Sequence, residues 1–379
     1  MSLVSHRCWA EVDLSALREN LAWLRHRVGA GVKILTVVKA DAYGHGLRQI
    51  AALLMQSGTD IFGVANLAEA QSIRGVGRGW PILMLGACLP DEIESAVRDG
   101  VMPTISTAAE AKLFSAAAQK LRRAVEFHVK VDTGMGRLGV APDRALALVK
   151  QVCRLPGLKL QGVLTHFAAV EDDEEFSRAQ RERFAQVLRM LESAGLLPSL
   201  IHASNSGALL HEPEARFNLV RPGLLVYGIA PQGTRRDTAK LPLRPALSWK
   251  CRVSLVKEIP RGATLSYGQA FTAARRMRVA TLTAGYGDGY LRAASGSAQV
   301  LVAGRRCAVL GRVTMDQMLV DVSGVRGVKA GVEAVLIGRQ GHEVISATEL
   351  ASWCGTIPWE VLTSITHRVP RVYRGSQAA

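Results

Sequence analysis

Short apolar runs alternate with amphipathic stretches over more than half of the chain. Runs rich in β-branched residues, as at residues 34–38 and 125–131, are typical of buried strands. Stretches with apolar residues three and four positions apart, as at residues 14–27 and 174–193, are typical of helices. Eight strands are predicted, with helices between most of them, at residues 34–38, 61–64, 82–85, 103–106, 125–131, 160–166, 199–203 and 217–220.

This repeat favours a parallel (β/α)8 barrel of the TIM type, in which strands and helices alternate along the chain. An open doubly wound sheet alternates in the same way and stays as the alternative. The pattern changes after residue 228, where residues 231–245, rich in proline and charge, are typical of a linker. Beyond it, short β-type runs are separated by glycine turns, and a helical pattern returns only at residues 347–353.

We therefore predict an α/β fold with two domains. Residues 1–240 are expected to form the barrel, and residues 241–379 a C-terminal all-β domain. The alternating run at residues 7–13 predicts one further strand, which can pair with the second domain. Asp13, at the end of that run, can cap the helix that follows.

The composition changes this picture little. A length of 379 residues exceeds one ordinary core, in agreement with a large barrel or two domains. The net charge of +15 is scattered and contains no long basic run, so it favours a solvated basic surface or anionic small-molecule substrates over nucleic acid.

The six cysteines lack metal-ligand spacing and are interpreted as reduced thiols. No run reaches membrane-spanning length and the N-terminus lacks a signal-peptide pattern, so we expect a cytoplasmic protein without a membrane partner.

One glycine-rich motif matches the dinucleotide-binding pattern but lacks the acidic residue that such a site needs. Gly134 to Gly139 spell GxGxxG after a predicted strand. A dinucleotide site needs an acidic residue about 20 positions further on for the ribose, and Lys159 stands near that position. The motif also follows several earlier strand–helix units, so we reject a dinucleotide site.

Polar residues follow several predicted strands at the point where each strand ends. They are Lys39, Lys130, Asp132, Arg137, His166, Asn205, Ser206 and Arg221. In a barrel these strand ends meet at one mouth, where active sites form. Each residue taken alone has a plainer interpretation: a solvated strand-end lysine or loop arginine, a satisfied histidine, a helix-capping serine, or a turn arginine before Pro-Gly.

Taken together, the strand-end residues predict a particular chemistry. A small Ser-Gly turn at Ser206, entering a helix, suits phosphate, and the loops after the seventh and eighth strands are where barrels commonly bind it. Lys39 supplies an amine across the same mouth. An amine and a phosphate cradle in one site are what an enzyme with a pyridoxal 5'-phosphate cofactor on a lysine Schiff base requires.

The motifs around these residues resemble the alanine racemase family, in order and over nearly the whole chain. They are Val-Val-Lys39-Ala-Asp-Ala-Tyr43-Gly-His-Gly, Val-Asp-Thr-Gly-Met-Gly-Arg137-Leu-Gly, Thr-His166-Phe-Ala, Asn205-Ser206, Val-Arg221-Pro-Gly, Leu-Ser-Tyr267-Gly, Gly-Tyr286-Gly-Asp-Gly-Tyr and Met315-Asp-Gln. The lysine motif alone would also suit related barrel proteins that bind the cofactor.

This resemblance implies a homodimeric isomerase that interconverts L-alanine and D-alanine, which supplies D-alanine for peptidoglycan biosynthesis. It implies that Lys39 carries the cofactor and moves the α-proton of the D-substrate. It also implies that Tyr267 of the partner subunit moves the α-proton of the L-substrate from the opposite face. Two bases on opposite faces are what racemisation needs.

The resemblance also assigns the residues around these two bases. Arg221 faces the pyridine nitrogen, which stays unprotonated because arginine keeps its own proton. The implied cofactor-binding set is Lys39, Tyr43, His166, Asn205, Ser206, Arg221, Gly223, Leu224 and Trp359. Arg137, Tyr286 and Met315 are the implied substrate contacts, and Lys130 matches a lysine that is carbamylated in some members. No metal is implied.

Two positions depart from the family pattern. Trp359 stands where a tyrosine is usual, and Thr314 replaces a common cysteine. Both positions lie near the substrate entrance in the family. A racemase of the same family with a broader or different preference, for serine or basic amino acids, therefore stays open beside alanine. A barrel decarboxylase that uses the same cofactor is more remote, because such enzymes place an acidic residue where Arg221 stands.

Overall fold

A computed structural model describes residues 6–231, 233 and 241–375 of the chain. The residues fall into two compact units. The barrel unit contains Ala16–Ala42 and Leu47–Arg244, and the β unit contains Met1–Ser15, Tyr43–Gly46 and Pro245–Ala379. Part of the linker predicted at residues 231–245, namely residues 232 and 234–240, lies outside the described residues.

The barrel unit is built on parallel strands whose order follows the sequence. Its strands are β2 (Lys33–Val37), β3 (Ile61–Val64), β4 (Ile82–Met84), β5 (Thr104–Ile105), β6 (Val125–Lys130), β7 (Leu158–Leu164), β8 (Leu200–His202) and β9 (Leu219–Val220). They form two four-stranded parallel sheets, β4-β3-β2-β9 and β5-β6-β7-β8. Backbone hydrogen bonds from Met84 N to Met102 O (2.9 Å) and from Arg221 N to Ser204 O (2.9 Å) join their edges. The predicted (β/α)8 barrel is thereby confirmed.

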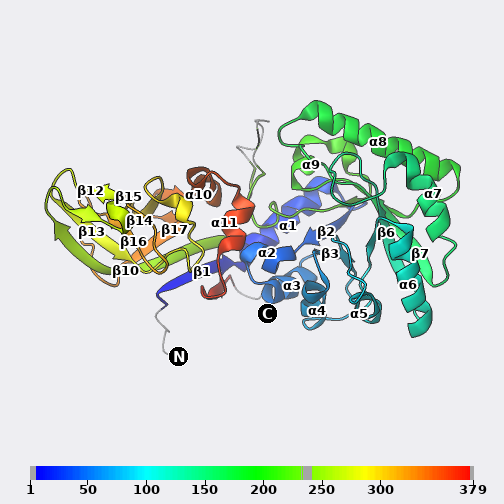
Figure 1. The fold of residues 1–379 in the computed structure, drawn as a ribbon, viewed down its shortest axis with the longest axis horizontal. Helices are drawn as coiled ribbons and strands as arrows, with labels where there is room; N and C mark the ends of the chain where they lie inside the picture. Colours follow the sequence, from blue (N-terminus) through cyan, green and yellow to red (C-terminus); the bar gives the residue numbers. More distant parts are fainter. Residues whose placement is uncertain (1–5, 232, 234–240, 376–379) are drawn as a thin grey trace. The chain divides into compact units, whose positions relative to one another are not determined.

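Helices surround these strands (Figure 1). They are α1 (Leu14–Val28), α3 (Leu47–Met55), α4 (Leu67–Arg74), α5 (Ile93–Arg98), α6 (Ala108–Leu121), α7 (Pro142–Val152), α8 (Glu174–Ser193) and α9 (Ser206–His211). Local sequence explains their starts: Thr107 forms a capping box with Glu110 at α6, Pro142 opens α7, and Asp173 caps α8. Buried apolar faces such as Leu17, Leu21 and Leu24 of α1 pack inward, as the sequence periodicity predicts.

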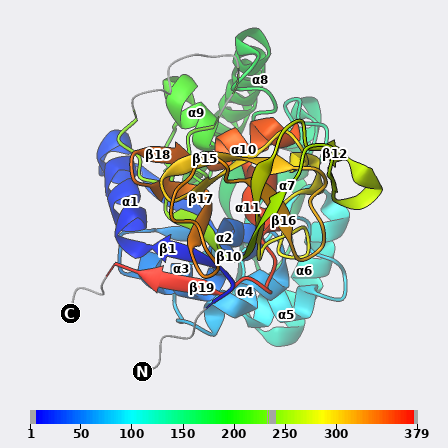
Figure 2. The same cartoon turned by 90° about the vertical axis from the view of Figure 1, so that its left-hand side faces the viewer.

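The β unit is a nine-stranded sheet in the order β18-β17-β14-β15-β16-β13-β10-β1-β19. Its members are β1 (Cys8–Asp13), β10 (Leu247–Ile259), β13 (Met277–Leu282), β14 (Gln299–Val302), β15 (Arg305–Leu310), β16 (Met318–Asp321), β17 (Glu333–Gln340), β18 (Glu343–Ile345) and β19 (Arg371–Arg374). The N-terminal strand β1 pairs antiparallel with β10 and parallel with β19, so the two ends of the chain share one sheet (Figure 2). The second domain is mostly strand, as expected.

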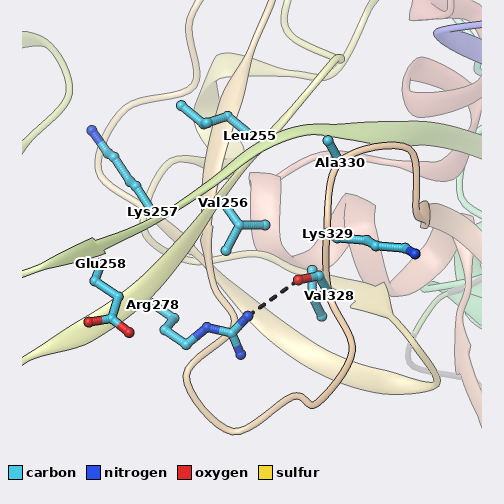
Figure 3. A pocket seen from close by; sticks show the side chains of 8 residues that line it. All are labelled: Leu255, Val256, Lys257, Glu258, Arg278, Val328, Lys329 and Ala330. Carbon is cyan, nitrogen blue, oxygen red and sulfur yellow. Dashed lines mark hydrogen bonds between the residues drawn. The ribbon is translucent and has the colours of Figure 1, made fainter.

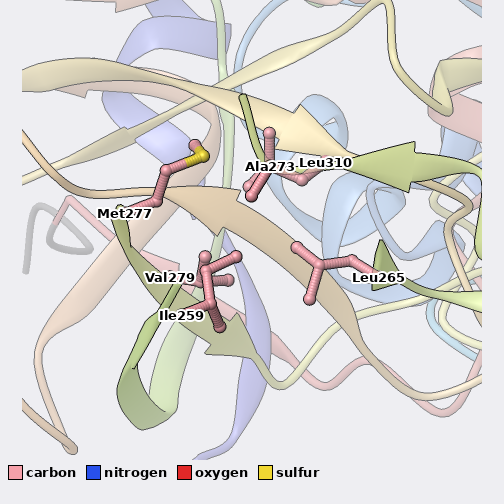
Figure 4. Close-up of a cluster of buried hydrophobic side chains, with 6 residues drawn as sticks. All are labelled: Ile259, Leu265, Ala273, Met277, Val279 and Leu310. Atoms are coloured by element: carbon pink, nitrogen blue, oxygen red, sulfur yellow. The ribbon is translucent and has the colours of Figure 1, made fainter. Parts of the chain in front are cut away.

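The small hairpin of β11 (Thr264–Leu265) and β12 (Phe271–Thr272) belongs to the same unit. It packs on a core of six buried side chains shown in Figure 4: Ile259, Leu265, Ala273, Met277, Val279 and Leu310. Two helices complete the unit, α10 (Ala347–Cys354) and α11 (Pro358–Ser364).

One local prediction was wrong. We expected a single β-type run at residues 299–310, but these residues form a hairpin of two strands that turns at Ala303 and Gly304, which both have positive φ. Helix α11 and strand β19 have no counterpart among the predicted elements. Both are short, and such elements are decided by tertiary packing more than by local periodicity.

Candidate active site

Lys39 follows strand β2 and begins a left-handed turn, where an ordinary loop was expected. This element, α2 (Lys39–Gly44), has φ between 52° and 55° at Ala40, Asp41, Ala42 and Tyr43. Left-handed backbone costs about 1–2 kcal/mol per non-glycine residue, so such a run needs external support. Glu69 supplies part of it, because its carboxylate accepts 2.7 Å hydrogen bonds from the backbone N–H of Ala40 and of Ala65.

The Lys39 ammonium stands among other cations. Burial lowers the pKa of Lys39, and the neighbouring Arg137 guanidinium lowers it further, while Glu69 opposes the change. Lys130 is 3% exposed, and burial together with Arg137 and Arg221 lowers its pKa to about 8. The site therefore holds an amine that is easier to deprotonate than free lysine. A cluster of desolvated cations is also the environment that an anionic ligand stabilises.

Arg221 is the buried centre of this group. The residue is 4% exposed, and burial lowers its pKa to about 9. Its Nη2 donates to the carbonyl oxygens of Thr165 (2.7 Å) and Ala203 (2.9 Å), and also contacts His166 Nδ1 at 3.2 Å. Among the described residues no carboxylate forms an ion pair with Arg221. The guanidinium thus enters the barrel mouth as an uncompensated cation.

A chain of two buried histidines supports Arg221 from behind. Arg221 Nη1 donates to His202 Nδ1 at 2.9 Å, and His202 Nε2 lies 2.8 Å from His128 Nδ1. Burial and the Arg221 charge lower the pKa of both histidines, in His128 to about 3. Both rings are therefore neutral at pH 7. Since arginine can only donate, His202 accepts at Nδ1. Its Nε2 carries the ring proton and donates a hydrogen bond to His128 Nδ1.

Hydrogen bonds hold His166 through both its backbone carbonyl and its ring. Gln180 of α8 is fully buried, and its Nε2 donates to His166 O (3.1 Å) and to Thr133 Oγ1 (3.2 Å). Its Oε1 accepts from the backbone N–H of Ala168 at 2.9 Å. Burial and the surrounding cations, Arg221 foremost, hold the His166 pKa well below its usual value, so the ring is neutral.

The rejected GxGxxG motif has a structural role. The Asp132 carboxylate accepts hydrogen bonds from the backbone N–H groups of Gly134, Met135 and Gly136, at 2.9–3.1 Å. This folds the loop that carries Arg137. Gly139 closes it with φ of 122°, where an added Cβ would lie 2.8 Å from Asp132 N.

Ser206 and Gly223 form the small cradle predicted after β8 and β9. Ser206 Oγ accepts from the backbone N–H of Gly223 at 2.9 Å, and Ser206, Gly223 and Leu224 are all buried. Asn205 is the N-cap of α9, because its Oδ1 accepts from Ala208 N at 2.9 Å. A buried hydroxyl and backbone N–H groups next to desolvated cations suit a phosphate group.

The remaining predicted residues lie in the β unit. Tyr43 is 6% exposed and its phenol hydrogen-bonds with the Trp359 side chain. Burial raises the pKa of Tyr43, so its phenol is neutral. Tyr286 N donates to Thr314 O (3.0 Å) and Gly287 N donates to Met315 O (2.8 Å), so the two expected substrate loops are joined.

Tyr267 is the most exposed large hydrophobic residue of this set. Its exposed fraction is 70%, against 53% for Met315 and 41% for Tyr286. It occupies the tip of the β11–β12 hairpin, in the short 3-10 turn η2 (Tyr267–Gln269).

A surface pocket of about 400 Å³ in the β unit is separate from these residues (Figure 3). Its lining includes Lys257, Glu258, Arg278 and Lys329, and Arg278 donates to Val328 O at 3.3 Å. None of its lining residues was predicted for the site. Within the described part of the chain, no helix is long and apolar enough to cross a membrane, and no three His, Cys, Asp or Glu side chains are placed to hold a metal ion.

Five predicted residues lie close enough at one barrel mouth for their charges to shift one another's pKa: Lys39, Lys130, Arg137, His166 and Arg221. Sequence reasoning missed three supporting residues: His128, His202 and Gln180. The two histidines lie within strands and Gln180 within a helix, where polar residues give no signal of burial. Only His202, at the end of β8, shares the strand-end position that singled out the others.

Comparison with known proteins agrees with this geometry. Residues 12–231 match the family described as alanine racemase, N-terminal domain, and residues 246–373 match alanine racemase, C-terminal domain. The chain belongs to the alanine racemase family. The expected enzyme class, an isomerase that depends on pyridoxal phosphate, is thereby confirmed.

Individual relatives match over nearly their whole length. The alanine racemase of Symbiobacterium thermophilum is 43% identical over 371 residues, which cover 98% of both chains. The alanine racemase structure from a D-cycloserine-producing Streptomyces lavendulae has a TM-score of 0.92 at 34% identity, covering 98% of both chains. That from Bartonella henselae, with covalently bound pyridoxal phosphate, has a TM-score of 0.88 at 28% identity, covering 97% of this chain and 100% of the other.

Proposed function

We propose that this alanine racemase exchanges the α-proton of alanine between two bases of its own, Lys39 and Tyr267. Pyridoxal phosphate, when bound, supplies an electron-withdrawing ring that makes the α-proton of the attached amino acid removable. The observation that carries the proposal is the group of buried cations around Lys39, with its lowered pKa and no carboxylate partner for Arg221 among the described residues. This donor set fits an anionic cofactor and an anionic substrate.

Lys39 Nζ is the base for the D-face of the substrate. A lowered pKa increases the fraction of free amine near neutral pH, which is the form that accepts a proton. The same free amine is the form that attaches a carbonyl cofactor. The Tyr267 phenol is the base for the L-face and returns the proton to the side opposite Lys39. Inversion follows because the two proton transfers occur on opposite faces.

Arg221 directs the reaction toward racemisation. Even with a pKa lowered to about 9 it is charged at pH 7, and it offers only donors to the pyridine nitrogen. Arg221 would therefore leave a bound pyridine nitrogen unprotonated, and an unprotonated ring would supply weaker electron withdrawal. A decarboxylase of this fold would carry an acidic residue at that place, so the position of Arg221 disfavours that alternative.

We assign the phosphate of the cofactor to Ser206, Gly223 and Leu224, with Asn205 setting the start of α9. Tyr43, on whose phenol Trp359 acts, is the further phosphate contact that the family resemblance implies. His166 would stand beside the cofactor ring as a neutral imidazole.

The substrate carboxylate would bind Arg137 and the Met315 backbone, with Tyr286 beside it. Lys130 is a candidate for carbamylation, because a pKa of about 8 leaves a sizeable fraction of its amine free to add carbon dioxide. The addition turns a buried cation into an anion that can pair with Arg137 and hold it in place. An intact-mass measurement that finds no added carbon dioxide would contradict this assignment.

We further propose that the enzyme is a homodimer in the cytoplasm and supplies D-alanine for peptidoglycan. The exposure of Tyr267, Met315 and Tyr286 in one chain supports the dimer, since tyrosine and methionine are enriched at protein–protein interfaces. A partner subunit that covers them would also bring Tyr267 to the other subunit's Lys39.

The test is to follow D/L interconversion for alanine, serine and basic amino acids with the purified protein. Alanine is expected to react fastest; a faster basic amino acid would favour the broader preference that Trp359 and Thr314 leave open. Lys39→Ala is expected to lose the absorbance of the bound cofactor. Tyr267→Phe should keep that absorbance and lose proton removal from L-alanine, and equal rates in variant and wild type would refute the role of Tyr267.

A further inference from the structure

The hairpin that carries Tyr267 packs on the core at its base, and the Tyr267 side chain is exposed at its tip. Leu265 of β11 pairs with Phe271 of β12. Leu265 belongs to the buried core cluster shown in Figure 4, and Phe271 packs against that cluster. The five residues between them hold a 70%-exposed Tyr267. Its position in one chain therefore depends on the backbone of the loop and not on packing of its own ring.

Ser266, directly before Tyr267, has an unusual backbone. Its φ is 66° and its ψ is 178°, a region that is essentially restricted to glycine. Gly268 and Gln269, directly after Tyr267, have φ of 68° and 51°. The tyrosine is thus flanked on both sides by residues with positive φ, and only one of these three is a glycine.

Specific contacts hold Ser266 in this conformation. Its Oγ donates to the backbone carbonyl of Arg312 at 2.7 Å. Its Cβ fits against Gly311, where an added Cβ would approach it to 2.8 Å, so a side chain at position 311 would expel it. Gly268 lies against the Arg312 guanidinium, which an added Cβ would meet at 3.1 Å. The Gly311–Arg312 segment thereby contacts the loop on both sides of Tyr267, at Ser266 and at Gly268.

We propose that Ser266 is a positioning residue, whose hydroxyl anchor and strained backbone fix the direction in which Tyr267 leaves the hairpin. The inference rests on the proposed role of Tyr267 as the L-face base. Its physical basis is that a non-glycine residue has few alternative conformations once its hydroxyl is held. A glycine at position 266 would relieve the backbone strain and let the Tyr267 side chain take other directions.

The test compares glycine and alanine at position 266 of the holoenzyme. Both variants lose the hydroxyl, so their difference reports the backbone alone. Ser266→Gly is expected to have a higher thermal midpoint than Ser266→Ala, by about 2 °C, because glycine tolerates this φ and ψ. It is expected to be the slower enzyme of the two, with kcat for L-alanine roughly 10-fold below wild type and little change in KM.

Ser254 provides the matched control. It lies in β10 at the register shift between Val253 and Leu255, has no positive φ, and its Oγ also donates to a main-chain carbonyl, that of Thr281 at 3.1 Å. There the stability order should reverse, with Ser254→Ala above Ser254→Gly, and racemisation should not change.

The outcomes separate this inference from the proposed function. If activity at position 266 follows stability, so that the glycine variant is both more stable and faster, Ser266 does not position Tyr267. If Tyr267→Phe is impaired but both Ser266 variants match wild type, the role of Tyr267 as a base stands and the positioning role of Ser266 is refuted. If Tyr267→Phe itself matches wild type, the proposed function fails. When both roles hold, adding Ser266→Gly to Tyr267→Phe causes no further loss of rate.

Discussion

Replacing Trp359 by phenylalanine removes the indole N–H that bonds to the Tyr43 phenol and keeps an aromatic ring in α11. A hydrogen bond of this kind contributes about 0.5–1.5 kcal/mol net. Tyr43 is only 6% exposed, so water has little access to its phenol. If Tyr43 donates to the cofactor phosphate, Trp359→Phe should weaken pyridoxal phosphate binding by about 2-fold to 12-fold.

The assay is titration of the apoenzyme with pyridoxal phosphate. Trp353→Phe is the matched control, because Trp353 packs in the neighbouring helix α10 against a separate apolar cluster. Burial raises the Tyr43 pKa, so the phenol stays neutral and the effect should not depend on pH between 6 and 9. Combined with Tyr43→Phe, the Trp359 change should cost nothing more. An unchanged dissociation constant in Trp359→Phe, or simple additivity with Tyr43→Phe, would refute this reasoning.

Three further predictions concern the barrel. Gln180→Met removes the three hydrogen bonds of the Gln180 side chain, one of them to His166 O, and should lower kcat and the thermal midpoint, whereas Gln186→Met on the exposed face of α8 should change neither. His202→Leu leaves a donor of the buried Arg221 without its acceptor, so the free energy of unfolding should fall by about 1.5–3 kcal/mol in denaturant titration; no loss would contradict the relay. Unmodified Lys130 has its folded pKa lowered to about 8, so the unfolded chain binds more protons between pH 8 and 10.5 and apoprotein stability should rise across that window. Lys130→Met should flatten that rise, and an identical pH dependence in both proteins would count against the burial of a free amine.

The barrel could be predicted from sequence because its elements are locally encoded. Buried parallel strands appear as continuous apolar runs, and the long helix α8 begins and ends at the residues that its amphipathic pattern predicts. The strand-end rule then identified Lys39 and Arg221 without knowledge of their contacts.

The rest depended on contacts between distant segments. Local sequence does not mark the left-handed turn after Lys39, since alanine at positions 40 and 42 rarely adopts it, and Glu69 holds the Ala40 N–H. Likewise, His128 resembles any residue of an apolar strand until His202, 74 positions later, is found beside it. The strain at Ser266 is equally invisible, because it is decided by the segment at Gly311 and Arg312.

The central claim is that two bases act on opposite faces of one alanine. The most direct measurement is racemisation of L-alanine by the purified protein in deuterium oxide, with the product followed by NMR and chiral separation. D-alanine that carries solvent deuterium at Cα is predicted from the first turnovers, because Lys39 supplies a proton that did not come from the substrate. D-alanine that retains the original hydrogen, or release of carbon dioxide without inversion, would contradict the account.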